Sequence, residues 1–258
     1  NHEQIQGVIA AAEELRAPVI INTSEKAMAY ASPASLADMV LPLAKRSRVK
    51  ICLNLDHGRV LASVKTCLHY GWSGVMFDGS RLADAVNVRQ TAVAVKMAKR
   101  YGVGVEGEIG RVKYADEVRK DPVPVLATPE QAVSFVRQTR VAALAVGIGN
   151  SHGLPLPNEH LDFKLLKRIQ QVVRIPLVLH GASSNTPAEI RKAISLGVAK
   201  INIDTELRRA FTATVRATVK PNHVLDPREY LGPAREAVKE FTDMGGRVFA
   251  SHWHNIWI

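Results

Sequence analysis

Seven apolar runs of strand length recur along the chain, and helix-like segments separate them. Within these runs polar and apolar residues do not alternate, which is typical of strands buried on both faces of a parallel sheet covered by helices. They occupy residues 17–23, 48–57, 74–80, 102–110, 142–153, 175–183 and 199–205. The segments that begin at Ser32 and Thr186 carry a capping residue followed by Pro, as helix starts do. The pattern therefore predicts a repeated strand-helix α/β chain.

A (β/α)8 barrel has eight strands, and this sequence opens inside an amphipathic helix, at residues 1–16, that nothing precedes. We therefore expect a TIM barrel that lacks its first strand in this chain, either as a fragment or with one edge open or filled otherwise. An open doubly wound sheet is the alternative. Because about 250 residues commonly form one such barrel, we expect a single domain over residues 1–258.

Charge and hydropathy limit the classes of partner. The formal net charge of +10 favours negatively charged partners: nucleic acid, anionic lipid or phosphorylated metabolites. Only 5% of the residues are aromatic and no nucleic-acid module is recognisable, which disfavours nucleic acid. The sequence contains no apolar stretch of the roughly 18 residues needed for a membrane span. Two cysteines are too few for a disulfide framework, and we expect a cytoplasmic protein.

Histidines and carboxylates lie at the ends of the predicted strands, where a barrel of this kind places its active site. His57, His152 and His180 each precede a glycine there, and glycine permits the unusual backbone angles that a site needs. Three neutral imidazoles with a fourth position open are typical of catalytic Zn²⁺. We therefore predict a zinc site at this rim.

The acidic residues at the same rim have several possible roles. Asp56 is a candidate general acid/base, or else a partner of a metal ligand or a helix cap. Asp56 and His57 leave a regular strand on opposite faces, so both reach one cavity only if the strand has ended. Asp78 and Glu108 are candidates for a second cation. Glu106 shares the parity of Glu108, and spacing does not separate the two.

Two later loops have the composition of a phosphate site. Small residues and helix N-termini leave backbone N–H groups free for anions, and barrels recurrently bind phosphate after their last two strands. An ordinary connection between strand and helix is the alternative interpretation. The candidate residues are Gly181, Ala182 and Ser183 in the first loop and Asn202, Ile203, Asp204 and Thr205 in the second.

At these residues the sequence resembles the class II, zinc-dependent ketose-bisphosphate aldolases, which act on fructose or tagatose 1,6-bisphosphate. The matching motifs follow the family order, from about Glu3 to Glu240, and are LNLDHG, GVMFDGS, VEGEIG, LAVGIGNSHG, IPLVLHGAS and KINIDTELR. The resemblance implies a (β/α)8 barrel that forms dimers or tetramers and often binds a monovalent cation. It also implies a reversible cleavage between C3 and C4 that yields dihydroxyacetone phosphate and glyceraldehyde 3-phosphate.

The resemblance assigns roles to individual residues. It implies that His57, His152 and His180 bind catalytic Zn²⁺, and that Asp56 is the acid/base. The second metal would be held by Asp78 and Glu108. The residues implied to hold the substrate phosphate are Gly153, Gly181, Ser183, Asn202, Asp204 and Thr205.

Several segments depart from the family pattern. About 25 preceding residues with the first strand are absent, and residues 111–121 replace the glycine-rich mobile loop. Asp116 or Glu117 is the candidate for the acid of that loop, Arg235 is a candidate for the distal phosphate, and the tail from Thr242 is atypical. A catalytically impaired relative that binds metal and phosphate is therefore the alternative function, and a zinc hydrolase is a third reading.

Overall fold

The computed structural model describes residues 1–153, 160–220 and 223–249. Seven strands form one parallel sheet in the order β1-β2-β3-β4-β6-β8-β9. The strands are β1 (Val19–Ser24), β2 (Ile51–Gly58), β3 (Gly74–Phe77), β4 (Gly104–Ile109), β6 (Ala143–Val146), β8 (Leu177–Leu179) and β9 (Val198–Ile201). Each lies within a predicted apolar run or overlaps it, so the strand-helix repeat is confirmed.

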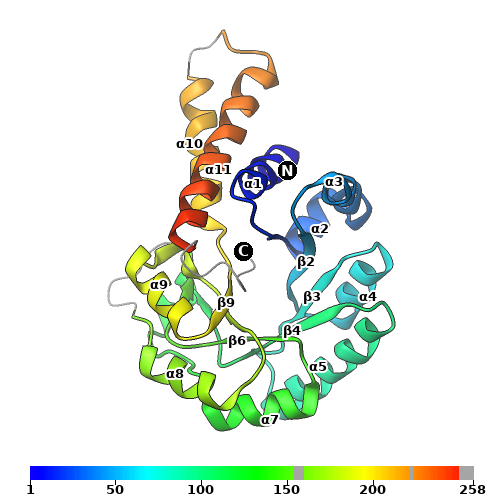
Figure 1. The fold of residues 1–258 in the computed structure, drawn as a ribbon, viewed down its shortest axis with the longest axis vertical. Coiled ribbons are helices and arrows are strands. Elements are labelled where there is room, and N and C mark those ends of the chain that lie inside the picture. The colour runs from blue at the N-terminus through cyan, green and yellow to red at the C-terminus, as the bar shows by residue number, and fades with distance from the viewer. Residues whose placement is uncertain (154–159, 221–222, 250–258) are drawn as a thin grey trace.

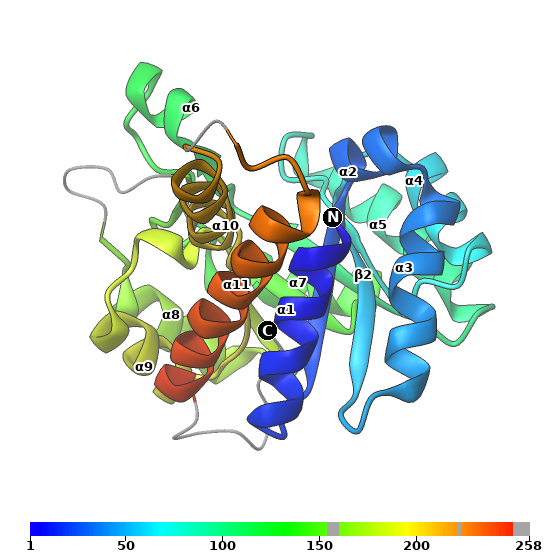
Figure 2. The ribbon, with the colours of Figure 1, turned by 90° about the horizontal axis from the view of Figure 1, so that it is seen from above.

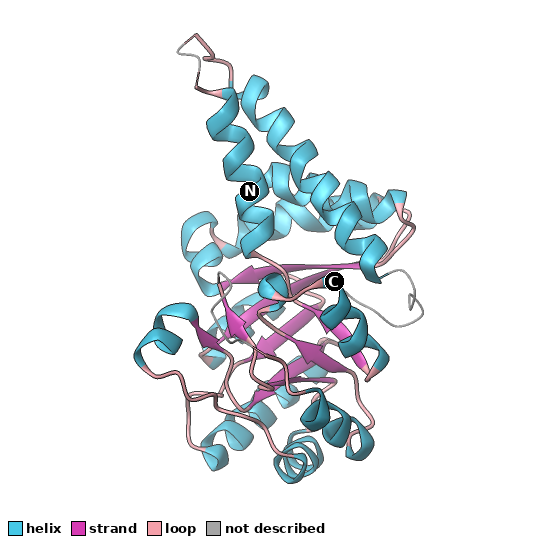
Figure 3. Ribbon diagram, turned by 90° about the vertical axis from the view of Figure 1, so that its left-hand side faces the viewer, coloured by secondary structure: helices cyan, strands magenta, loops and turns pink. Residues whose placement is uncertain are grey.

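Helices cover the outer face of the curved sheet, as Figures 1 and 3 show. The helices of the described residues are α1 (His2–Glu14), α2 (Glu25–Ala31), α3 (Pro33–Arg46), α4 (Leu61–His69), α5 (Asp84–Lys99), α6 (Ala115–Lys120), α7 (Pro129–Thr139), α8 (Phe163–Val172), α9 (Pro187–Ser195), α10 (Thr205–Thr218) and α11 (Pro227–Phe249). The predicted caps form: Ser32 accepts from the Ser35 amide, and Thr186 accepts from the Glu189 amide. The fold is thus an α/β half-barrel of the TIM-barrel type.

The edge strands β1 and β9 face the seam of this half-barrel, where a full (β/α)8 barrel would have an eighth strand between them. Helix α1 packs along α11 beside the seam, and α10 and α11 extend from the barrel as a helical hairpin (Figures 1 and 2). Gly7 of α1 permits this close packing, since a Cβ there would lie 2.7 Å from the Arg235 carbonyl oxygen. Helix α11 reaches Phe249, and residues 250–258 of the atypical tail lie outside the described part.

A single large apolar cluster fills the space between sheet and helices. Buried polar groups generally need hydrogen-bond partners, and Thr23 on β1 and Trp72 have them. The Trp72 indole N–H donates to Thr23 Oγ1 over 3.0 Å, and that hydroxyl donates to the Asn54 carbonyl over 3.0 Å. These bonds fix the register of β1 against β2 beneath the site.

The run at residues 142–153 was predicted as one strand, and this was wrong. Strand β6 ends at Val146, and a turn at Gly149, with φ of 100°, separates it from β7 (Ser151–His152). Asn150 braces the turn by accepting from the Ile148 amide and donating to the His180 carbonyl. Strand β7 pairs with β5 (Lys113–Tyr114), a small sheet that the apolar pattern did not indicate.

Candidate active site

The end of β2 brings two adjacent side chains into one cavity. The ladder between β2 and β3 is irregular between Leu55 and Gly58, and His57 has a φ of 49°. A positive φ is uncommon for a residue with a side chain, and such strain gathers at functional sites. Because the strand is no longer regular there, Asp56 and His57 both face the mouth of the barrel. The two side chains can therefore reach one cavity, as we expected if the strand had ended at this point.

The three predicted histidines meet at this mouth. One ring nitrogen of each lies within 4.8 Å of the others. His57 Nε2 is 3.0 Å from His180 Nδ1, and the His57 and His152 rings meet edge to face with centroids 4.8 Å apart. Burial and the neighbouring His57 and His180 hold the pKa of His152 well below its usual value. A neutral imidazole is the form that binds a metal.

Two of the predicted carboxylates lie beside the imidazoles. Asp78 Oδ2 is 2.8 Å from His57 Nδ1, and Glu108 Oε2 is 3.8 Å from the same atom. Burial lowers the pKa of His57, but the charges of Asp56, Asp78 and Glu108 outweigh it and raise that pKa to about 9. Burial and the nearby Asp78 charge raise the pKa of Glu108. His57, Asp78 and Glu108 also form a second group of ligand atoms that could hold a cation.

The structure separates Glu106 from Glu108, which spacing alone did not. Glu106 Oε1 lies 2.7 Å from His180 Nε2, on the side of the ring opposite His57. Its other oxygen is 2.9 Å from the buried ammonium of Lys200. Burial raises the pKa of Glu106, but Lys200 and His180 more than offset this and lower it to about 2. Glu106 is therefore an ionised partner of a candidate ligand.

Asp56 is held from the opposite side of the barrel. Asn202 Nδ2 donates to Asp56 Oδ1 over 3.0 Å, and Asn202 Oδ1 accepts from Lys200 over 2.7 Å. Asp56, Asn202, Ile203 and Asp204 also line a cavity of about 270 Å³ that runs along the seam. A substrate in this cavity would contact the Asp56 carboxylate directly.

The predicted phosphate loops lie at the same rim. Gly181 has a φ of 65°, and a Cβ there would overlap the Ser151 carbonyl oxygen, so only glycine fits. It precedes a short 3₁₀ turn over Ala182–Ser184. Gly153 has a φ of 111° at the end of β7, and Thr205 begins α10 directly after Asp204. These loops bring together the predicted residues, whose contact with phosphate remains a prediction.

The segment that replaces the mobile loop lies over the histidines. Tyr114 stacks on His152 with ring centroids 4.8 Å apart. Glu117 is bound by Arg81 and Arg111, each with Nη2 2.9 Å from its carboxylate. Arg235, the candidate for the distal phosphate, pairs with Glu236 on α11.

Two site residues were missed by the sequence analysis. Lys200 looked like an ordinary member of a KINIDT motif, although a lysine inside a buried strand is rare unless it is paired. Tyr114 lay in a segment with no strand pattern. The presence of a charged residue within an apolar run could have identified Lys200 as a candidate site residue. The sequence around Tyr114 contains no comparable signal.

A metal fits the residues that are present. Among the described residues, neither His152 Nε2 nor Glu108 Oε2 has a hydrogen-bond partner, although both atoms are buried. Buried polar atoms without partners are costly, and each of these two residues belongs to a group that could hold an ion: His152 with the other two histidines, and Glu108 with His57 and Asp78.

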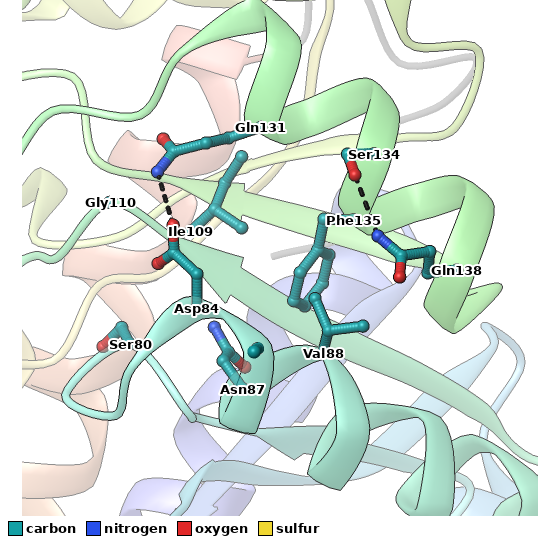
Figure 4. Close-up of a pocket in the computed structure, with 11 residues that line it drawn as sticks. Ser80, Asp84, Asn87, Val88, Ile109, Gly110, Gln131, Ser134, Phe135 and Gln138 are labelled. Carbon is teal, nitrogen blue, oxygen red and sulfur yellow. Dashed lines mark hydrogen bonds between the residues drawn. The ribbon is translucent and has the colours of Figure 1, made fainter.

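A second cavity, of about 290 Å³, lies between α5 and α7 (Figure 4). Two pairs of its lining side chains bond to each other: Gln131 donates to Asp84 over 3.0 Å, and Gln138 donates to Ser134 over 2.8 Å. The histidine cluster is not among the residues that line it. The chemistry is therefore concentrated at the barrel mouth.

Comparison with known proteins agrees with this geometry. The family model described as fructose-bisphosphate aldolase class-II matches residues 1–252. The chain belongs to the class II fructose-bisphosphate aldolase family. Class II aldolases are lyases, and the resemblance of the six motifs is thereby confirmed.

Individual relatives support the same family. A fructose-bisphosphate aldolase of Thermus caldophilus is 43% identical, with 97% of this chain and 90% of that protein covered. A sulfofructosephosphate aldolase of Alkalicoccus urumqiensis is 34% identical, with 97% and 88% covered. The crystal structure of the YdjI aldolase from Escherichia coli K12 is 33% identical with a TM-score of 0.85, over 99% of this chain and 90% of that one. The names of these relatives therefore refer to more than one substrate.

Proposed function

We propose that this aldolase reversibly cleaves a ketose 1,6-bisphosphate, fructose or tagatose, to dihydroxyacetone phosphate and glyceraldehyde 3-phosphate. The observation that carries the proposal is the meeting of His57, His152 and His180 within 4.8 Å, beside the Asp56 carboxylate. The donor set suits Zn²⁺, since three imidazoles with an open fourth position are its common catalytic ligands. Bound there, Zn²⁺ would act as a Lewis acid on the substrate carbonyl and adjacent hydroxyl.

The residues of the chain would supply the remaining steps. Asp56, oriented by the Asn202 amide, accepts the proton of the C4 hydroxyl as the C3–C4 bond breaks, and returns it in the reverse direction. The proton that C3 gains to complete dihydroxyacetone phosphate would come from the candidate loop acid, Asp116 or Glu117. The loops at Gly153, Gly181–Ser183 and Asn202–Thr205 would bind the phosphate next to the reacting carbonyl. The sites for a second divalent and a monovalent cation remain predictions, with Asp78 and Glu108 the candidates for the divalent one.

One observation favours the alternative, a catalytically impaired relative that binds metal and phosphate. Glu117, a candidate for the loop acid, is already engaged by Arg81 and Arg111. A loop held by two ion pairs would deliver that acid less readily. This alternative predicts zinc binding without turnover.

The deciding experiment is a coupled assay for triose phosphate with each bisphosphate, with and without added Zn²⁺. Turnover that EDTA abolishes supports the aldolase, and zinc retention without turnover supports the alternative. Asp56→Asn should keep zinc and lower kcat by about 10²–10⁴-fold, as loss of a general acid/base does. Asp162→Asn is a matched control, because Asp162 caps α8 away from the histidines and Asn is an equally good cap.

One observation and one further expectation concern the protein outside its active site. No helix among the described residues is long and apolar enough to cross a membrane. A homodimer or homotetramer remains our proposal on the strength of the family, and light scattering of the purified protein tests it.

A further inference from the structure

A chain of buried and half-buried polar side chains crosses the interior of the barrel behind the histidines. It begins at His180, passes through Glu106 and Lys200, and ends at Asn202, which donates to Asp56. The distances along it are 2.7, 2.9, 2.7 and 3.0 Å. Lys200 lies between the candidate metal ligand and the candidate acid/base.

The topology makes this contact a property of the curved sheet. Glu106 is on β4 and Lys200 on β9, and β6 and β8 lie between them in the sheet. Side chains three strands apart can touch only across the concave face. The register partner of Glu106 on β6 is Ala143, a small residue that leaves room for the crossing.

The cost of burying these charges indicates a purpose beyond packing. Lys200 and Glu106 are each 5% exposed, and a buried ion pair is on average no more stabilising than apolar residues of similar size. Both Glu106 oxygens are used, one by His180 and one by Lys200. The carboxylate is therefore fixed in orientation, and it accepts the Nε2 hydrogen of His180, so that Nδ1 faces the other imidazoles.

We propose that Lys200 and Glu106 are positioning residues that align the metal ligand His180 and the acid/base Asp56 through one shared ammonium group. Glu106 forms the arm that orients His180, as carboxylates commonly do for metal-bound histidines. Asn202 forms the arm that orients Asp56. This inference rests on the proposed metal site and acid/base, and it assigns residues that neither role includes.

The two arms predict different effects of substitution. Glu106→Gln should raise the dissociation constant for Zn²⁺ by about 10–100-fold, which is the usual effect of losing a carboxylate partner of a metal-bound histidine. Its kcat at saturating zinc should change less than threefold, because Lys200 still holds Asn202. Lys200→Met should raise the same constant by a similar factor and, in addition, lower kcat at saturating zinc by about tenfold or more. KM should change little in either variant.

The experiment measures zinc affinity by competition with a chromogenic chelator, kcat and KM at saturating zinc, and the visible spectrum of the cobalt-substituted protein. The double variant Glu106→Gln/Lys200→Met removes both charges together, so it should fold even where Lys200→Met leaves a buried carboxylate unpaired. Its zinc affinity should equal that of Glu106→Gln, because both changes break the same arm. The cobalt spectrum of all three variants should differ from that of the wild type.

Thr139→Val is the matched control, since it removes a buried hydrogen bond, from Thr139 Oγ1 to the Phe135 carbonyl, at the end of α7. It should lower the Tm without changing zinc affinity or the cobalt spectrum. Zinc affinity of the Glu106 and double variants within twofold of wild type would overturn the inference while leaving the proposed function intact. Failure of the wild-type protein to bind zinc would overturn both.

Discussion

His180 Nδ1 and His57 Nε2 lie 3.0 Å apart, although 123 residues separate them in the sequence. They come from the ends of β8 and β2, which are not neighbours in the sheet. When these two rings and the neighbouring His152 are neutral, their facing nitrogens offer lone pairs to one small region. The arrangement is therefore best understood as a ligand set for a cation.

Removal of one of these ligands tests the metal site. His180→Ala should abolish stoichiometric zinc binding and lyase activity together, because two remaining imidazoles leave a zinc site incomplete. Metal analysis of the dialysed protein measures the first effect and the triose phosphate assay the second. Removal of zinc from the wild type with EDTA should reproduce the loss of activity, and added Zn²⁺ should restore it only in the wild type.

The raised pKa of His57 predicts that protons compete with zinc. The titratable groups that face this ring are Asp56, Asp78, Glu108, His152 and His180. Since the pKa rises from 6.5 to about 9, the ring of the metal-free protein is protonated at pH 7 and must lose that proton to bind zinc. Calorimetry in two buffers of different ionisation enthalpy should show proton release at pH 7 and less at pH 9.5.

The same pKa shift makes the stability of the metal-free protein depend on pH. A group whose pKa is raised on folding contributes stability fully below its unfolded value of 6.5, and this contribution is lost as the pH rises through about 9. The Tm of EDTA-treated protein should therefore fall between pH 6.5 and 9. An equal fall in His57→Gln would show that another group is responsible.

Ser183→Ala tests the phosphate loop. Loss of a hydrogen bond to a charged phosphate should weaken binding of phosphorylated substrate by about 1–3 kcal/mol, seen in KM more than in kcat. Inorganic phosphate should also become a weaker competitive inhibitor. Ser195→Ala is the control, because Ser195 donates to the Lys192 carbonyl on exposed α9; if both variants behave alike, Ser183 has no special role.

Tyr114 should support His152 through its ring and not through its hydroxyl. The stacked rings lie 4.8 Å apart, and such aromatic pairs contribute about 0.5–1.5 kcal/mol. Tyr114→Phe should therefore keep the zinc affinity of the wild type, while Tyr114→Ala should weaken it by about two- to tenfold. Weakening by both variants in the same chelator competition would assign the effect to the hydroxyl instead.

Much of the fold was predictable because a strand that is buried on both faces is a continuous apolar run. Such a run can be recognised in the sequence without knowing which strands lie beside it. The runs around Leu53, Val75 and Leu179 each became a strand of the sheet. The run at residues 142–153 failed as a single strand, because the turn at Gly149 depends on Asn150 bonding to the His180 carbonyl, a contact between distant segments.

The end of the sheet that carries the chemistry could be inferred from the order of the residues alone. His57, His152 and His180 follow strand-like runs, and the carboxyl ends of parallel strands share one rim whatever the details of packing. The contacts of the carboxylates at this rim, in contrast, depend on the three-dimensional fold. Glu106 and Glu108 have the same parity on β4, yet one contacts Lys200 across the barrel and the other lies beside His57. Period-two alternation fixes the face of a side chain, whereas its partner depends on the curvature and stagger of strands far apart in sequence.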